Sequence, residues 1–328
     1  MSLIERAVAR LTEAQAEPSV ADARRPSESG PDERESTIAR LADRLAESTP
    51  RGTPPLSPQG TETAAEARAA PPAARAQDAP PRPAGEHQAV RIDLDALRVR
   101  GMVVPSGPPT PASHEFRIIK RPLLDNAFGR SGQPMARSSK RIMVTSAFPG
   151  EGKSFCAINL AISIAAERDH AVILVDADVA RPSIPRELGI PASAGLMDWL
   201  VGEERDLSRL VLRTNVDKLS ILHAGHRHEH ATELLASEAM AGMLDALSDA
   251  YPDTVFVFDS PPLLVTTEAR VLASYMGQVV MVVEAGKTPR EAVATALSTI
   301  ESREHIGLVL NKAVNSESSG YYPGYGAA

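Results

Sequence analysis

The chain has few aromatic residues and a single cysteine. Phe, Tyr and Trp make up 4% of its 328 residues, and none occurs before Phe116. Because a folded core normally needs large apolar side chains, the N-terminal third is not expected to contain one. Cys156 stands alone, which excludes an internal disulfide and fits a reducing cytoplasm. We expect this thiol to pack inside a helix.

Long apolar runs are also missing. No stretch approaches the roughly 18 residues that a membrane-spanning helix needs, so any membrane association is expected to come only through a partner. The N-terminal stretch MSLIERAVARL carries charges within its apolar pattern, unlike a signal peptide. The formal net charge of −7 argues against nucleic acid as the main partner.

The N-terminal region reads as two segments. Residues 1–16 are predicted to form a short amphipathic helix, because four apolar residues share one helical face: Leu3, Ile4, Val8 and Leu11. This helix either docks on a partner or is transient, since so short a helix is marginal in water. Residues 17–90 are rich in Pro and Ala and are predicted to be a disordered linker.

From residue 140 onward, short apolar runs alternate with helical periods. The predicted strands cover 142–146, 172–178, 219–225, 254–260, 278–286 and 306–312. The predicted helices cover 153–168, 232–249, 266–275 and 288–302. Near-continuous apolar strands separated by helices indicate an α/β fold, a mostly parallel sheet with helices on both faces, here assigned to residues 91–313. Ligands of such sheets bind at the carboxyl ends of the strands.

The first of these carboxyl ends carries a phosphate-binding loop. Residues 147–154, AFPGEGKS, follow the pattern G-x-x-x-x-G-K-[ST] except that Ala147 replaces the first Gly. Between a strand and a helix, this pattern predicts a P-loop NTPase that binds ATP and Mg²⁺. The two loop glycines let successive backbone amides point at phosphate oxygens, and the helix dipole adds to the attraction. The predicted nucleotide contacts are Pro149, Gly150, Glu151, Gly152, Lys153, Ser154 and Phe155.

Lys153 is expected to reach the β- and γ-phosphates, and the Ser154 hydroxyl to bind Mg²⁺. Asp259 ends the strand TVFVFD, where a carboxylate is the expected Mg²⁺ partner of a P-loop enzyme. Asp176 and Asp178 stand two residues apart on an extended strand and therefore point toward one site. Such a pair can complete the metal shell or accept a proton. Asp178 has a purely structural alternative as a helix cap or ion pair.

Ser154, Asp176 and Asp259 are thus the predicted metal ligands.

The C-terminal segment, residues 314–328, adds a cluster of tyrosines: Tyr321, Tyr322 and Tyr325. Gly and Pro between them disfavour regular structure. Exposed phenols on a flexible tail are suitable phosphoacceptors, although a low-complexity terminus is the plainer interpretation of this segment alone.

Together these motifs resemble a known family. Residues 112–328 are similar to the bacterial tyrosine kinases (BY-kinases) of capsule and exopolysaccharide synthesis, through PGEGKS, VDAD, FDSPPLL, ATELLASEAM, VLNK and the tyrosine-rich end. More narrowly, MSLIERAVARL, EFRIIKRPLL, DADVARPSI and YYPGY resemble the exosortase-associated tyrosine autokinases.

The resemblance implies an ATP-dependent protein-tyrosine kinase that phosphorylates its own tail and regulates exopolysaccharide polymerisation and export. It implies that Asp176 deprotonates the tyrosine, that Asp178 and Asp259 complete the acidic motifs, and that Asn311 touches the adenine. An Asn at a strand end is also a common turn residue. The implied partners are other subunits of a homo-oligomeric ring and a membrane-anchored polysaccharide chain-length regulator, which would recruit a cytoplasmic chain to the inner face of the membrane.

The chain departs from the family pattern at three places. The arginine expected at position 180 comes one residue later, at Arg181, and Glu268 stands where Asp is frequent. The ring-forming motif E-x-x-R-x-x-R is only approximated, by His114, Arg117 and Lys120, with Glu115 and Arg121 offset by one.

Two other functions remain open on sequence alone. A partitioning-type ATPase switch would carry an extra Lys where this chain has Phe148, and a non-catalytic adaptor of an export complex would bind ATP without turnover. The histidine-rich stretch, with His223, His226, His228 and His230, is predicted to be a solvated loop rather than a metal site. Trp199 is predicted to pack in the core.

Overall fold

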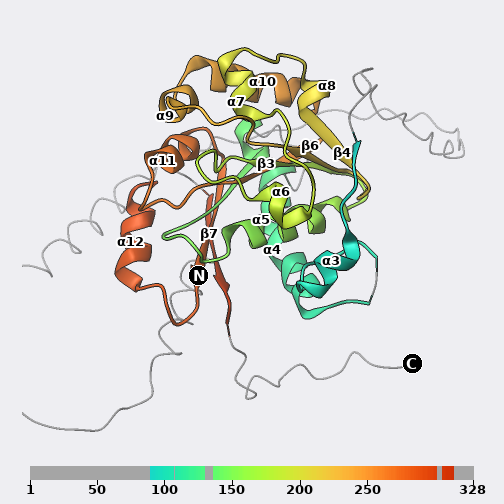
Figure 1. Cartoon of the computed structure of the whole chain (residues 1–328). Coiled ribbons are helices and arrows are strands. Elements are labelled where there is room, and N and C mark those ends of the chain that lie inside the picture. Colours follow the sequence, from blue (N-terminus) through green and yellow to red (C-terminus); the bar gives the residue numbers. More distant parts are fainter. Residues whose placement is uncertain (1–88, 107, 130–135, 301–304, 314–328) are drawn as a thin grey trace, which may run out of the picture. The chain divides into compact units, whose positions relative to one another are not determined.

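The computed structural model of the chain describes residues 89–106, 108–129, 136–300 and 305–313 (Figure 1). The predictions for residues 1–88 and for the tyrosine tail lie outside these described residues. None of the described helices is long and apolar enough to cross a membrane.

The described strands form one eight-stranded sheet in the order β1-β4-β5-β3-β6-β2-β7-β8. The strands are β1 (Ala89–Val90), β2 (Arg141–Ser146), β3 (Ala171–Asp176), β4 (Val211–Thr214), β5 (Leu219–Leu222), β6 (Thr254–Asp259), β7 (Gln278–Glu284) and β8 (His305–Asn311). All neighbouring strands run parallel except β4 and β5, which are antiparallel. The mostly parallel sheet predicted from the sequence is confirmed.

Helices lie on both sides of this sheet. They are α3 (Leu94–Val99), α4 (Pro111–Phe128), α5 (Lys153–Ala165), α6 (Ile184–Leu188), α7 (Leu196–Val201), α8 (Leu207–Leu210), α9 (Ala231–Leu235), α10 (Glu238–Ala250), α11 (Thr267–Ser274) and α12 (Arg290–Ser298), with a 3-10 turn at Arg137–Lys140. Helix α5 is buried along nearly its whole length, because α4 covers it on one side and the sheet on the other.

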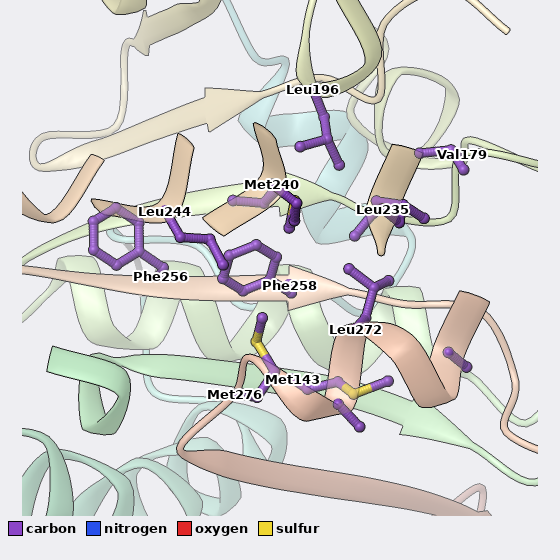
Figure 2. Close-up of a cluster of buried hydrophobic side chains, with 14 of the residues drawn as sticks. Met143, Val179, Leu196, Leu235, Met240, Leu244, Phe256, Phe258, Leu272 and Met276 are labelled. Carbon is purple, nitrogen blue, oxygen red and sulfur yellow. The ribbon is translucent and has the colours of Figure 1, made fainter. Parts of the chain in front are cut away.

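The alternation of side chains along the strands divides the core into two clusters. Ile142 and Val144 of β2 face the cluster that contains α4 and α5, whereas Met143 faces the other one. Figure 2 shows that second cluster, where Phe256 and Phe258 of β6 meet Leu244 of α10. Burying both faces explains why the central strands read as unbroken apolar runs.

Several predicted elements have different boundaries. Residues 89 and 90, predicted as linker, form β1 against β4. The predicted helix 232–249 is two helices, because Ser237 adopts an extended conformation between them. The strand predicted as 172–178 ends at Asp176, so Asp178 lies in the following turn.

Two predictions about single side chains are confirmed. Cys156 is buried in α5, and burial raises the pKa of its thiol to about 12, which makes it unreactive. Trp199 is buried in α7, where the Arg205 guanidinium lies 5.3 Å from the centre of its ring.

Candidate functional site

The phosphate loop joins β2 to the first turn of α5, as the sequence predicts. Gly150 and Gly152 have φ of 85° and 96°, a left-handed conformation that favours glycine. Gly152 is doubly restricted, because a Cβ there would overlap the side-chain amide of Asn311. Lys153 opens the helix directly after it, so the loop amides and the positive end of the helix dipole face the same space.

The buried side chain of Glu151 stabilises the conformation of the phosphate loop. Its side chain is almost completely buried, and its carboxylate accepts a hydrogen bond from the backbone N–H of Phe148 at 2.7 Å. The hydroxyl of Thr288, between β7 and α12, donates to the same carboxylate. The loop is therefore shaped before any nucleotide arrives.

The end of β8 holds the loop from outside. The Asn311 amide donates to the backbone oxygen of Glu151 at 2.8 Å, and the Lys312 ammonium donates to that of Gly150 at 2.7 Å. Lys312 also pairs with Glu284 at 3.3 Å and has an unusual left-handed backbone, with φ of 57°. Asn311 thus lies at the phosphate loop, where it contacts the protein backbone; its contact with adenine stays a prediction.

The register of the sheet brings two aspartates side by side. Asp176 ends β3 and Asp259 ends β6, and the two residues are direct neighbours in the parallel pairing of these strands. Both are completely buried. Asp176 accepts hydrogen bonds from the backbone N–H groups of Ser183 and Ile184, each at 3.0 Å.

Lys153 and Ser154 face these carboxylates. The Lys153 ammonium lies 2.9 Å from Asp178, an ion pair that is almost wholly buried. The Ser154 hydroxyl lies near Asp259 and lowers the pKa of that carboxyl, and the Ser183 hydroxyl lies within hydrogen-bond distance of both Ser154, at 2.8 Å, and Asp259, at 3.2 Å. The structure therefore brings together five of the predicted site residues at the head of α5: Lys153, Ser154, Asp176, Asp178 and Asp259.

Burial dominates the electrostatics of this cluster. Loss of solvation raises the pKa of Asp176 to about 7 and that of Asp259 to about 6. Desolvation alone would lower the pKa of Lys153, but the nearby Asp259 and Asp178 outweigh it and raise that pKa. The cluster thus combines three acids with a single close ammonium group.

The acids leave room for a cation. One oxygen of Asp176 and one of Asp259 are buried without a hydrogen-bond donor among the described residues. Buried carboxylate oxygens normally have partners, and hard divalent cations prefer oxygen ligands. The arrangement of these two oxygens beside the Ser154 hydroxyl fits Mg²⁺.

Three residues at the site were not predicted from the sequence. Ser183 stands seven positions after Asp176. It joins the site because the intervening turn folds back onto the end of β3, which the sequence pattern does not reveal. Thr288 and Lys312 come from distant elements. Of the predicted nucleotide contacts, Phe155 packs its side chain against the core and Pro149 is exposed.

The histidine-rich stretch is not a uniform solvated loop. His223 is buried, and desolvation lowers its pKa to about 4. His226 forms an ion pair with Asp198 at 2.5 Å, whereas His228 and His230 are exposed. The prediction of a solvated loop is confirmed for His226, His228 and His230, which are exposed, and is wrong for His223.

Comparison with known proteins places this site in context. Residues 137–262 match the ParA family model, described as NUBPL iron-transfer P-loop NTPase. Tyrosine-protein kinase YwqD of Bacillus subtilis is 29% identical over 239 residues, which cover 71% of this chain and 96% of that protein. Tyrosine-protein kinase CpsD of Streptococcus agalactiae is 28% identical, with 61% of this chain and 86% of the relative covered. The succinoglycan biosynthesis transport protein ExoP of Rhizobium meliloti is 32% identical, but only 24% of it is covered.

Among solved structures, the kinase domain of VpsO superposes with a TM-score of 0.52 at 26% identity, covering 62% of this chain and 96% of that domain. The kinase domain of the Escherichia coli tyrosine kinase ETK gives a TM-score of 0.54 at 20% identity, with 72% and 95% covered, and shows the shared fold.

The fold and the phosphate loop define the chain as a P-loop NTPase. Within that class, the matches confirm the resemblance read from the sequence motifs: the chain is a relative of the bacterial tyrosine-protein kinases. The narrower resemblance to the exosortase-associated autokinases stays a prediction.

Proposed function

We propose that the chain is a protein-tyrosine kinase that transfers the γ-phosphoryl group of Mg-ATP to Tyr321, Tyr322 and Tyr325 of its own tail. The observation that carries this proposal is the convergence of Lys153, Ser154 and two buried aspartates at the head of α5. The relatives named tyrosine-protein kinases support the reaction type.

Nucleotide binding requires a rearrangement at Lys153. The Lys153 ammonium exchanges Asp178 for the β- and γ-phosphates, while the loop amides bind the remaining phosphate oxygens. Ser154, Asp176 and Asp259 would hold Mg²⁺, which neutralises charge on the phosphates when bound. Most of the catalytic effect is then positioning and electrostatic stabilisation.

Asp176 is the proposed acceptor of the phenolic proton. The tyrosine oxygen forms a bond to the γ-phosphorus, the bond from that phosphorus to the bridging oxygen of ADP breaks, and the proton passes to Asp176. Burial raises the pKa of Asp176 to about 7 in the metal-free chain, and a bound Mg²⁺ would lower it and keep the carboxylate ionised, as a proton acceptor must be.

The biological setting is proposed from the relatives. ExoP is named for succinoglycan biosynthesis transport, so a role in exopolysaccharide production is the natural assignment. We propose a membrane-anchored chain-length regulator as activator, and tail phosphorylation between subunits of a ring. In α4, Lys120 is buried in an ion pair with Glu167 of its own chain, whereas His114 and Arg117 are exposed and remain available to a neighbouring subunit.

One experiment separates this proposal from its two alternatives. The purified chain is incubated with Mg-ATP, and released phosphate is measured beside the mass of the C-terminal peptide. An autokinase adds phosphate to the tail, and Lys153→Met abolishes the addition. A partitioning-type ATPase releases phosphate and leaves the tail unmodified, and a non-catalytic adaptor does neither. Either of the last two results would refute the proposal.

A further inference from the structure

A second group of ligand-type side chains is formed by residues other than those at the head of α5. Asp198 of α7, Glu203 just after that helix, and His226 in the loop after β5 place a carboxylate oxygen or ring nitrogen each within 4.8 Å of the others. The two segments that supply them are distant in sequence, so the group exists only in the folded chain.

The backbone is shaped to bring these side chains together. Gly202 ends α7 in a left-handed conformation, and the N–H of Glu203 then donates to the backbone oxygen of Asp198 at 2.9 Å. On the other side, Gly225 has φ of 84° and lies so close to the Asp198 carboxylate that a Cβ would overlap it. The loop after β5 therefore packs directly against the buried carboxylate of Asp198.

The charges of the group are not balanced. Asp198 is almost fully buried and accepts hydrogen bonds from the N–H of Gly195, at 2.6 Å, and from the His226 ring, at 2.5 Å. Glu203 forms no hydrogen bond or ion pair with another described side chain. Even with His226 protonated, two carboxylates face a single positive charge.

An independent feature of the sequence points the same way. His226 belongs to a stretch, HAGHRHEH, that carries four histidines within eight residues. Such density is typical of metal-binding segments. The nucleotide site makes no use of it, since the proposed phosphotransfer needs only the residues at the head of α5.

We propose that Asp198, Glu203 and His226 bind a divalent transition-metal ion, with Zn²⁺ as the best match. One imidazole nitrogen and two carboxylate oxygens are ordinary zinc ligands, and a tetrahedral site would place such atoms about 3.3 Å apart. The observed spacing reaches this value with small side-chain shifts, because Glu203 and His226 are both exposed. A water molecule would complete the shell.

The metal would pin the β5–α9 loop to α7. This loop leaves the sheet beside the end of β3, which carries Asp176, and leads into α9. There the Thr232 hydroxyl donates to Glu268 of α11 at 2.8 Å. The proposed role is structural: it stabilises the carboxyl edge of the sheet and takes no part in phosphotransfer.

Direct titration tests the site. Metal-free full-length protein, without ATP and in excess Mg²⁺, is titrated with Zn²⁺ against a coloured chelator, and Co²⁺ is used in parallel for its visible spectrum. The wild type is expected to bind one equivalent and to gain thermal stability with Zn²⁺. Glu203→Gln and His226→Asn should each weaken binding at least about tenfold, as loss of a metal ligand does.

The double variant His228→Asn/His230→Asn is the matched control, because it removes exposed histidines of the same loop and should keep the site. The zinc-free thermal midpoint of Glu203→Gln should equal that of the wild type, which separates lost binding from misfolding. The proposal is overturned if the wild type binds no zinc, if Glu203→Gln and His226→Asn bind like the wild type, or if the double variant alone abolishes binding. Tail phosphorylation is measured separately, so failure here leaves the proposed kinase activity untouched.

Discussion

At the scale of single residues, the most consequential feature is the burial of Asp176 beside Asp259. The folded chain raises both pKa values above those of exposed aspartates, so the folded state holds these protons more tightly than the unfolded one. Their contribution to stability is therefore present below about pH 4 and is lost as the pH rises through about 6 to 7. At neutral pH the two buried carboxylates therefore destabilise the folded chain, and a bound cation would reduce this destabilisation.

Asp259→Asn should make the metal-free protein more stable at about pH 8, by at least about 1 kcal/mol, since one pKa unit corresponds to about 1.4 kcal/mol. Little gain is expected at about pH 3.5, where the carboxyl is largely protonated in both the folded and the unfolded chain. Urea unfolding in the presence of a chelator measures both. Asp249→Asn, which removes an exposed acid, is the control and should change neither. A loss of stability at the higher pH would contradict the electrostatic assignment.

Gly152 provides a second test at this scale. Gly152→Ala forces a Cβ into the Asn311 amide as well as into an unfavourable backbone conformation. It should lower ATP affinity at least about tenfold, because the backbone amides of the phosphate loop no longer point at one phosphate group. Gly101→Ala has a similar φ but open space around it and should cost only about 1 kcal/mol of stability. Equal nucleotide binding by both variants would show that the conformation of the phosphate loop does not depend on Gly152.

At the scale of elements, the packing of α4 on α5 depends on one buried cation. The Lys120 ammonium lies 2.7 Å from Glu167 and donates to the backbone oxygen of Ser163, in the last turn of α5. The hydrogen bond and charge of Lys120 outweigh desolvation and lower the pKa of Glu167. Arg121 contacts the same carboxylate from an exposed position.

Lys120→Met should therefore destabilise the fold by about 1–3 kcal/mol, because a buried carbonyl and a carboxylate lose their donor. Arg121→Met should cost less than about 0.5 kcal/mol, as exposed ion pairs contribute little. Chemical unfolding of the two variants gives the comparison. Similar losses of unfolding free energy in both variants would mean that the buried Lys120–Glu167 pair contributes no more to stability than the exposed Arg121–Glu167 pair.

The elements also show what the sequence could and could not predict. The central strands and α5 were predictable because each is a continuous apolar run ending at a chemical motif. β1 and β4 were missed because they are only two and four residues long, with β1 at the edge of the described sheet and β4 next to it. The pairing of Lys153 with Asp178 was left open between alternatives, and Ser183 was missed, because both depend on a turn whose path no local pattern encodes.

At the scale of the whole molecule, the described residues form one compact unit with two core clusters. The sequence of residues 1–79 contains no aromatic side chain and is not expected to contribute to a core. Removal of residues 1–79 should therefore leave the thermal midpoint and ATP binding unchanged, whatever those residues do with partners. Calorimetry of the shortened chain measures this, and a lower midpoint would show that the N-terminal region supports the fold.

The central claim is that Mg-ATP is held at the head of α5 by this chain's own lysine and aspartates. The most direct test is calorimetric titration with Mg²⁺ and a non-hydrolysable ATP analogue. Wild type and Asp249→Asn are expected to bind alike, whereas Lys153→Met and Asp259→Asn should bind at least about tenfold more weakly. Binding that is absent in the wild type, or unchanged in Lys153→Met and Asp259→Asn, would contradict the account.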